Sequence, residues 1–596
     1  MKDQGTGKKP APFHWLCLAA CFAYFLGQPP VHFPLSAWIS CALFAWIVAD
    51  TKAMPRRYWL ASWGSASLMW LALLQGIRLA FWPLTFGWIA LSLYLAVYFP
   101  VALGIGISLH HRYRFRLPWA CAIAWTTTEL LRSYVITGFA ACSLVHSQTP
   151  WPAVIQAASE FGGIGVGFLM MLTSAWLIEK VVAWRTYARE VANTQVATTS
   201  PNTKSKQNPT SRWWLHLLQS LPRNCIAVWI FLTAATWISR SRYLEELAPI
   251  KPLGRFLLIQ ENMPTMFDMT VELLEEGSEA YLQTTKRAFE ALEGKTADVL
   301  VWPESIYTQG SPTILWDQGP LVPPELMVER SQLAISVHGA QLAQDVKLAQ
   351  LRRAAQGASL PNLLMGTDVF SIVDGKLDRY NAALWIPSNV IPSNVILSNG
   401  GNPSEEKLDY YAKQHLVMFG EYIPVLSWFP SVMQSIGMGT LSVGKEAKSW
   451  RLKSGRRITT NVCFEDVVPH LMQRQLRELK KRGESPDVMI NISNDGWFHG
   501  SSILNHHLNS AIVTAVENRI PVLVASNTGI SAWIDGDGRV VEQLPKLQGG
   551  WIIAEPTPDG REGMWSWWGD KPAWAVAFVG LFPCMRWIVC RLRRRP

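Results

Sequence analysis

Three polar residues follow or interrupt apolar segments that are typical of β-strands. Glu304 stands in VLVWPES, Cys463 stands in NVCFED, and Lys413 stands in YYAKQHLVMFGEYIP. A thiol becomes a nucleophile when it loses its proton, which a nearby carboxylate accepts, and a nearby ammonium stabilises both the thiolate and a developing oxyanion. Taken singly, Glu304 also fits a solvated carboxylate and Lys413 a surface lysine. Together the three residues predict covalent catalysis by a cysteine.

The distribution of cysteines singles out Cys463. The chain has nine cysteines, and eight of them lie in or beside long apolar runs: Cys17, Cys21, Cys41, Cys121, Cys142, Cys225, Cys584 and Cys590. Cys463 is alone in the more polar stretch between residues 241 and 572. A lone thiol there has no disulfide partner in its own segment, so it is either a small buried apolar residue or a reactive group. Position alone leaves both alternatives open.

The segments that must position these residues alternate between short apolar strands and amphipathic helices. Strands are expected at 253–260, 297–302, 362–370, 458–465, 487–493, 521–526 and 530–535. Helices are expected near 270–293, 328–355, 467–483 and 505–518. This alternation predicts an α/β domain with mostly buried sheets, in which residues at strand ends face a crevice. Residues 388–408 predict an excursion or a lid loop.

Long apolar runs before and after this domain predict a membrane protein. Hydrophobic residues make up 49% of the chain and charged residues 16%. Eight runs are long enough, or nearly so, to cross a bilayer. They lie at about 13–27, 34–50, 58–81, 84–107, 117–139, 164–184, 224–240 and 573–590. We therefore expect a membrane domain at 1–240, an outer domain at 241–572, and a last span with a basic tail at 573–596.

The placement of Lys and Arg predicts the orientation of these runs. If the N-terminus lies in the cytoplasm, three of the segments that connect the runs lie outside the membrane, at 28–33, 82–83 and 140–163. None of these outer segments contains Lys or Arg. Cytoplasmic loops keep the excess of basic residues, so both termini are expected in the cytoplasm and residues 241–572 outside. Arg240 and Arg242 are the exception to this pattern. The net charge of +10 is explained by the inner loops, so no nucleic-acid partner is expected.

Two pairs of polar residues could form a site other than the one around Cys463. Glu129 and Arg132 stand i, i+3 near the outer end of the fifth apolar run. Ionisable groups in a span are costly, so this pair is either a structural ion pair or a site for a phospholipid headgroup. His506 and His507 are neighbours and face different directions on a helix, so they do not form an i, i+4 metal pair. No metal site is expected.

Several separate motifs occur in an order that identifies a family. They are VWPES, the pattern K-x-x-L-V-x-F-G-E-Y-x-P from Lys413 to Pro424, NVCFE, SNDGWF, AVENRIPVLVASNTGISAWID and, in the membrane part, ELLRSYVITGF. On these motifs the chain resembles the nitrilase superfamily, and within it the membrane-bound apolipoprotein N-acyltransferases. The resemblance covers nearly the whole chain. Met418, Phe464 and the pair Ala140-Ala141 depart from the family pattern.

The resemblance implies a fold and a set of roles. The fold would be a multi-span α-helical membrane domain plus a nitrilase-like α/β/β/α sandwich on the periplasmic side of a bacterial inner membrane. Cys463 would be the nucleophile, Glu304 the general base and acid, and Lys413 the oxyanion stabiliser. The supporting residues would be Glu421, Glu465 and Phe464.

The resemblance also implies a reaction and its partners. A fatty acyl chain would pass from a membrane phospholipid to Cys463 as a thioester, and then to the α-amine of a diacylglyceryl-cysteine at the N-terminus of an apolipoprotein. Such a reaction requires no cofactor, and a monomer is favoured. The alternative enzyme is a membrane-anchored amidase with the same three residues. A transporter or lipid-binding module is the alternative from another class, but it predicts the loss of at least one of the three residues, and none is lost.

Overall fold

A computed structural model describes residues 12–197 and 251–592, except for 267–268, 308–311, 318–320, 324–325, 327–328, 356–359, 389–407, 418–420 and 422–440. The predicted run at 224–240, residues 389–407 of the predicted lid loop and Met418 lie outside this part. The chain divides into two compact units. A helical unit contains Met1–Leu74, Ile89–Ser239 and Trp568–Pro596, and an α/β unit contains Gln75–Trp88 and Arg240–Trp567.

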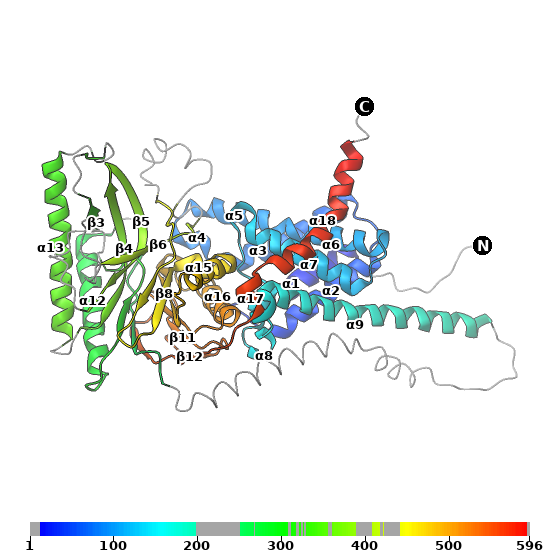
Figure 1. Ribbon diagram of the computed structural model, residues 1–596. Helices are drawn as coiled ribbons and strands as arrows, with labels where there is room; N and C mark the ends of the chain where they lie inside the picture. Colours follow the sequence, from blue (N-terminus) through cyan, green and yellow to red (C-terminus); the bar gives the residue numbers. More distant parts are fainter. Residues whose placement is uncertain are drawn as a thin grey trace. The chain divides into compact units, whose positions relative to one another are not determined.

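The helical unit is built from apolar helices joined by short connections. Its described helices are α1 (Phe13–Gly27), α2 (Pro34–Asp50), α3 (Arg56–Leu73), α5 (Leu84–Ala96, of which Ile89 onward belongs here), α6 (Tyr98–Ile107), α7 (Leu117–Tyr134), α8 (Pro152–Ile155), α9 (Ala158–Ala197) and α18 (Lys571–Leu592). Short helical turns η1 (Ser108–Arg112), η2 (Val135–Thr137) and η3 (Leu144–Gln148) lie between them. Figure 1 labels most of these elements.

Two stretches of the described chain, Leu84–Arg112 and Ala158–Ala188, are long and apolar enough to cross a membrane, while α1 and α2 are apolar but shorter. The eight-crossing topology therefore stays a prediction. The single predicted run at 58–81 is wrong, because α3 ends at Leu73 and a separate helix, α4 (Ile77–Ala80), follows. Gly76 lies at this break, where a Cβ would come within 2.1 Å of Ser501 Oγ.

Two sheets form the centre of the α/β unit. Among the described residues, the first sheet has the order β13-β1-β2-β4-β5-β6, with β3 beside β4, and the second has the order β12-β11-β10-β9-β8-β7. The first contains β1 (Phe256–Gln260), β2 (Val299–Trp302), β3 (Thr313–Trp316), β4 (Asn362–Val373), β5 (Lys376–Ile386), β6 (Asp409–Ala412) and β13 (Gly550–Ala554). The second contains β7 (Ser449–Arg451), β8 (Arg457–Val462), β9 (Val488–Ser493), β10 (Val522–Ser526), β11 (Ala532–Ile534) and β12 (Val540–Gln543).

The central strands of each sheet are buried on both faces. In β1, Leu257 and Ile259 belong to the core beneath the helices, while Phe256 and Leu258 belong to the core between the sheets. This alternation follows from the two-residue period of a strand, and it explains why the central strands read as continuous apolar runs. The strand pairs β1–β2, β2–β4, β3–β4, β8–β9 and β9–β10 are parallel, and the other described pairs are antiparallel.

Helices cover the outer face of each sheet. Figure 1 shows α12 (Val271–Glu290) and α13 (Arg330–Ala354) on the first sheet, where Tyr281 and Leu348 join its core. The helices α15 (Pro469–Lys481) and α16 (Ile503–Asn518) belong to the second half, and α16 contacts β10 and β11. The result is the α/β/β/α sandwich that the resemblance implies, and it agrees with the α/β domain that the strand and helix pattern predicts. All of the predicted strands and helices of this unit are present, with boundaries shifted by a few residues.

Candidate active site

The three predicted catalytic side chains lie at strand ends on both sheets. Glu304 follows β2 and Lys413 directly follows β6, both in the first sheet, whereas Cys463 directly follows β8 in the second. Glu304 and Lys413 both act electrostatically on Cys463, so the structure brings the three together. Two of these turns contain a residue with a left-handed backbone conformation. They are Ser305, which follows Glu304 and has a φ of +59°, and Cys463 itself, with a φ of +54°.

Lys413 forms the centre of a buried polar network. Its Nζ lies 3.3 Å from Glu304 Oε1 and 2.9 Å from Glu421 Oε1, and only 1% of the Lys413 side chain is exposed. Asn381 Nδ2 donates to the same two carboxylate oxygens at 2.6 and 2.8 Å. The second oxygen of Glu304 accepts a hydrogen bond from the Asn494 N–H at 2.9 Å. Each carboxylate therefore has a fixed orientation.

The charges in this network support one another. Burial alone would lower the pKa of Lys413, but Glu304 and Glu421 outweigh burial and hold it well above its usual range. Burial opposes the ionisation of Glu421 in turn, and Lys413 outweighs it, so the pKa of Glu421 is lowered. Lys413 is thus an ammonium at neutral pH, as oxyanion stabilisation requires.

Cys463 sits on a strained turn and is protonated at rest. It begins the turn η7 (Cys463–Val467) in a left-handed conformation that is uncommon for a residue with a side chain, and the residue is partly exposed. Burial and then Glu304 raise the pKa of its thiol to about 12, against the lowering effects of Lys413 and His507. At neutral pH the thiol is therefore protonated.

Glu465 connects the turn that carries Cys463 to the opposite sheet. Its carboxylate accepts hydrogen bonds from Val462 N at 2.8 Å, in the second sheet, and from Gln414 N at 2.6 Å and His415 N at 3.0 Å, after β6 of the first. The hydroxyl of Tyr411 donates to it at 2.9 Å. Burial raises the pKa of Glu465 to about 7, while these donors favour the carboxylate and oppose that rise.

Phe464 and one further carboxyl lie near this network. The rings of Phe464 and His415 stack with their centroids 6.2 Å apart. Asp368 is the direct partner of Asn381 across the β4–β5 pair, so both side chains leave the same face of the sheet. Burial first, and then Glu304 and Glu421, raise the pKa of Asp368 to about 6. Sequence reasoning singled out neither Asp368 nor Asn381, because nothing local distinguishes them from other strand residues.

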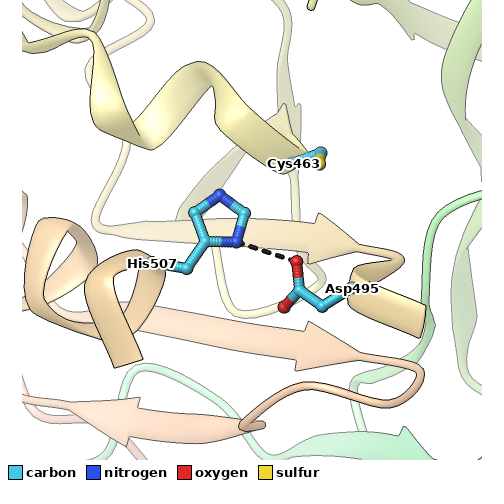
Figure 2. Close-up of side chains that lie close together, drawn as sticks. All are labelled: Cys463, Asp495 and His507. Carbon is cyan, nitrogen blue, oxygen red and sulfur yellow. Dashed lines mark hydrogen bonds and ion pairs between the residues drawn. The ribbon is translucent and has the colours of Figure 1, made fainter. Parts of the chain in front are cut away.

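His507 lies between two buried carboxylates beside Cys463. Its Nδ1 is 3.0 Å from Asp495 Oδ1 and its Nε2 is 3.3 Å from Asp466 Oδ1. Figure 2 shows His507, Asp495 and Cys463, whose donor atoms lie within 4.8 Å of one another. Burial opposes the charge of His507, but the two aspartates outweigh it and hold its pKa well above the usual range. A protonated imidazole offers no lone pair to a metal ion.

The pair Glu129 and Arg132 lies in the helical unit, buried on α7. Arg132 donates to the carbonyls of Phe139 at 2.9 Å and Ala141 at 2.7 Å and to Ser143 Oγ at 2.9 Å. Its guanidinium lies 3.8 Å from Glu129 Oε1. These contacts, directed to the loop that follows α7, are those of a structural ion pair. Binding of a lipid headgroup by the pair stays a prediction.

Comparison with known proteins places both parts of the chain in one family. The family model of the apolipoprotein N-acyltransferase N-terminal domain matches residues 20–176, and that of the carbon-nitrogen hydrolases matches residues 266–561. A protein named apolipoprotein N-acyltransferase from Rhodopirellula baltica is 28% identical, covering 97% of this chain and 99% of its own. One of the same name from Geobacter metallireducens is 26% identical, covering 76% of this chain and 71% of its own.

A solved structure of a CN-hydrolase superfamily protein from Xanthomonas campestris shares 16% identity at a TM-score of 0.31, covering 50% of this chain and 89% of its own. The family models and the two relatives named above agree with the motifs and with the sandwich. The chain therefore belongs to the apolipoprotein N-acyltransferase family, within the carbon-nitrogen hydrolase superfamily.

Proposed function

We propose that this protein transfers a fatty acyl chain from a membrane phospholipid, through a thioester on Cys463, to the α-amine of the S-diacylglyceryl-cysteine that begins a lipoprotein. The names of its relatives support the activity. The observation that carries the mechanism is the buried pair of Glu304 and Lys413, 3.3 Å apart at strand ends of the first sheet, beside Cys463 at a strand end of the second. This arrangement supplies a base, a fixed cation and a thiol at one place.

In the first half-reaction, Cys463 Sγ attacks the ester carbonyl of the phospholipid while its proton passes to Glu304. The Lys413 ammonium stabilises the oxyanion that forms. The ester C–O bond then breaks, Glu304 returns the proton to the departing lysophospholipid, and the acyl chain remains on sulfur. Because the thiol is protonated at rest, its proton must move during the attack, which gives Glu304 its role.

Glu421 allows Glu304 to change its protonation state. Lys413 is paired with both carboxylates, so when Glu304 takes a proton the buried ammonium keeps Glu421 at 2.9 Å as its partner. A buried cation that lost its only counter-ion would be strongly destabilised. We therefore infer that Glu421 preserves the charge of Lys413 through the reaction cycle, while Glu465 holds the turn of the nucleophile against the first sheet.

In the second half-reaction, the α-amine attacks the thioester carbonyl, the C–S bond breaks, and an amide forms. Glu304 accepts the proton that the amine loses and returns it to the Cys463 thiolate. Donor and acceptor are both lipids, and removing an acyl chain from a bilayer costs about 0.8 kcal/mol per CH₂. This cost favours an enzyme embedded in the membrane that holds its substrates.

We also propose how the chain is arranged in the membrane. Residues 1–240 and 573–596 would lie in the bacterial inner membrane with both termini in the cytoplasm, and residues 241–572 would form the periplasmic catalytic domain of a monomer. The basic segments inside and the outer segments without Lys or Arg support this orientation. No cofactor enters the scheme.

The test separates the two half-reactions. Purified enzyme given phospholipid alone should release one lysophospholipid per active site and then stop, with a mass gain of one acyl group. A diacylated lipopeptide with a free amine should restart turnover, whereas its N-acetylated form should not. Glu304→Gln and Lys413→Ala should lose the initial burst, the latter by about 100-fold or more for a lost oxyanion contact. Lys453→Ala, at an exposed position, serves as the control.

The match to carbon-nitrogen hydrolases makes an amidase the second candidate. An amidase must admit water to its thioester. Continuous release of free fatty acid from phospholipid without any amine acceptor would show that water deacylates Cys463 readily, and would replace the transferase with a hydrolase.

A further inference from the structure

His507 is a buried charged residue that the proposed mechanism does not use. It belongs to α16, and its side chain is 12% exposed, while those of Asp466 and Asp495 are 2% and 3% exposed. Asp466 comes from the turn η7 that carries Cys463, and Asp495 comes from the turn η8 (Asp495–Phe498) that follows β9. One imidazole thus connects three elements next to the thiol, as Figure 2 shows for two of them.

Asp495 is held through its carboxylate, and Asp466 is held through its backbone. The carboxylate of Asp495 accepts hydrogen bonds from Ser493 Oγ at 2.9 Å and Ser526 Oγ at 3.0 Å. The backbone of Gly529 approaches it so closely that a Cβ there would come within 2.1 Å of Asp495 Oδ2. The backbone carbonyl of Asp466 accepts from Thr514 Oγ1 of α16 at 3.2 Å. The Asp495 carboxylate, held by these contacts, can fix the position of the charged imidazole accurately.

The charges that face His507 are Asp466 from η7 and Asp495 from η8, and the thiol of Cys463 lies beside them. Around Cys463, the imidazolium and Lys413 favour the thiolate, whereas Asp495 and Glu304 disfavour it. Without His507, the nearest remaining charge on this side of the sulfur would be a carboxylate. Loss of the thiol proton would then be opposed from two directions.

We propose that His507 is a positioning residue for acyl transfer: held as an imidazolium between Asp466 and Asp495, it fixes the turn of the nucleophile and keeps a positive charge beside the Cys463 sulfur. The inference rests on the proposed role of Cys463 as nucleophile. His507 keeps its proton throughout, because Glu304 receives the thiol proton. Its contribution is electrostatic and geometric, and no bond to substrate is formed by it.

The experiment measures Cys463 itself and does not require acyl transfer. The second-order rate of alkylation of Cys463 by iodoacetamide is followed by peptide mass across pH 6 to about 10, where thiols ordinarily titrate. Wild-type protein is compared with His507→Asn and Asp466→Asn. The control is His499→Asn, because His499 is exposed and has a left-handed φ of +44° that asparagine tolerates.

We expect His507→Asn to slow alkylation at least about threefold at every pH below the thiol pKa. A rise of one pKa unit lowers the thiolate fraction about tenfold, and the higher nucleophilicity of a more basic thiolate returns about a factor of three. Asp466→Asn keeps the imidazole but weakens its hold on the proton. Its rate should be close to that of the wild type at low pH and fall toward that of His507→Asn as the pH rises.

A purely structural role gives a different result. His507→Asn and Asp466→Asn would then lower the thermal stability while each folded protein alkylates within twofold of the wild type at every pH, and the proposal would be overturned. If His507→Asn does not fold, the pH-dependent divergence of Asp466→Asn decides alone. Failure of acyl transfer by the wild type would reject the proposed function but would leave this measurement intact.

Discussion

Replacement of Gly366 by alanine tests how closely the site depends on the position of Glu304. Gly366 lies in β4, and a Cβ added to it would be 2.2 Å from the carbonyl oxygen of Pro303 and 2.4 Å from Glu304 Cα. Its own carbonyl accepts a hydrogen bond from Tyr307 N at 3.0 Å. The turn that carries Glu304 therefore lies directly against the backbone of Gly366, with no space for a methyl group.

The size of the effect follows from these distances. An ordinary van der Waals contact begins near 3.4 Å, so Glu304 Cα must move by about 1 Å to accept the methyl group. Such a shift removes Glu304 Oε1 from hydrogen-bond distance of Asn381 or Lys413, which lie at 2.6 and 3.3 Å. Misplacement by this amount is expected to slow acylation about 100-fold. Overpacking should also destabilise the fold by about 1–3 kcal/mol.

The assay is the rate and amplitude of lysophospholipid release in a single turnover, measured together with the melting temperature. Gly339→Ala is the matched control, since Gly339 lies in α13 with nothing within 4 Å of the added Cβ. That variant should keep the wild-type burst and gain slightly in stability, because alanine favours a helix by about 1 kcal/mol over glycine. A Gly366→Ala burst within threefold of the wild-type rate would show that the position of Glu304 is not critical.

Three further changes have defined outcomes. Glu421→Gln should slow the burst about 100-fold or more while leaving Cys463 alkylation measurable, because Lys413 would lose its remaining counter-ion when Glu304 is protonated; an unchanged burst contradicts this role. Asp368→Asn should raise the free energy of unfolding at pH 7.5 by up to about 3 kcal/mol and have little effect below pH 4, since a folded-state pKa raised to about 6 makes the ionised form destabilising as pH rises through that range; equal melting temperatures at pH 7.5 would refute it. A membrane-impermeant thiol reagent added to the periplasmic side should label Cys463 and none of the other cysteines, and labelling only after the cytoplasmic side is opened would overturn the proposed topology.

The sequence predicts the central strands well for a physical reason. β2 and β9 are buried along their whole length, so they appear as apolar runs between turns. The sequence does not predict β5, because its first five residues, 376–380, are exposed or half-exposed and mostly polar, and its apolar run begins only at Ala382. The short outer strands β3, β6, β7, β12 and β13 were missed for the related reason that three to five residues give too little pattern.

The sequence predicts those site residues whose side chains have an obvious catalytic use and that stand in a recognisable motif, namely Glu304, Lys413 and Cys463. The sequence does not identify Asn381, because its role depends on the strand pairing. That pairing brings its amide to two carboxylates that are distant in the sequence. The sequence argument about His507 considers only whether it could form a metal pair with His506 on the same helix. Its partners Asp466 and Asp495 belong to other turns, and a rule confined to one helix cannot find them.

The pairing of β1 with β13 has a consequence for how the protein is made. Residues 256–260 are among the first of the α/β unit to be synthesised, yet their antiparallel partner is 550–554, almost at its end. Until that strand arrives, β1 has an unpaired edge, which is a template for association with other chains. A truncated product that ends before Gly550 would carry this edge permanently. Ribosome stalling or premature termination after the codon for His507 and before that for Gly550 should therefore yield aggregation-prone chains that proteases remove, even though every residue of the candidate site has already been made.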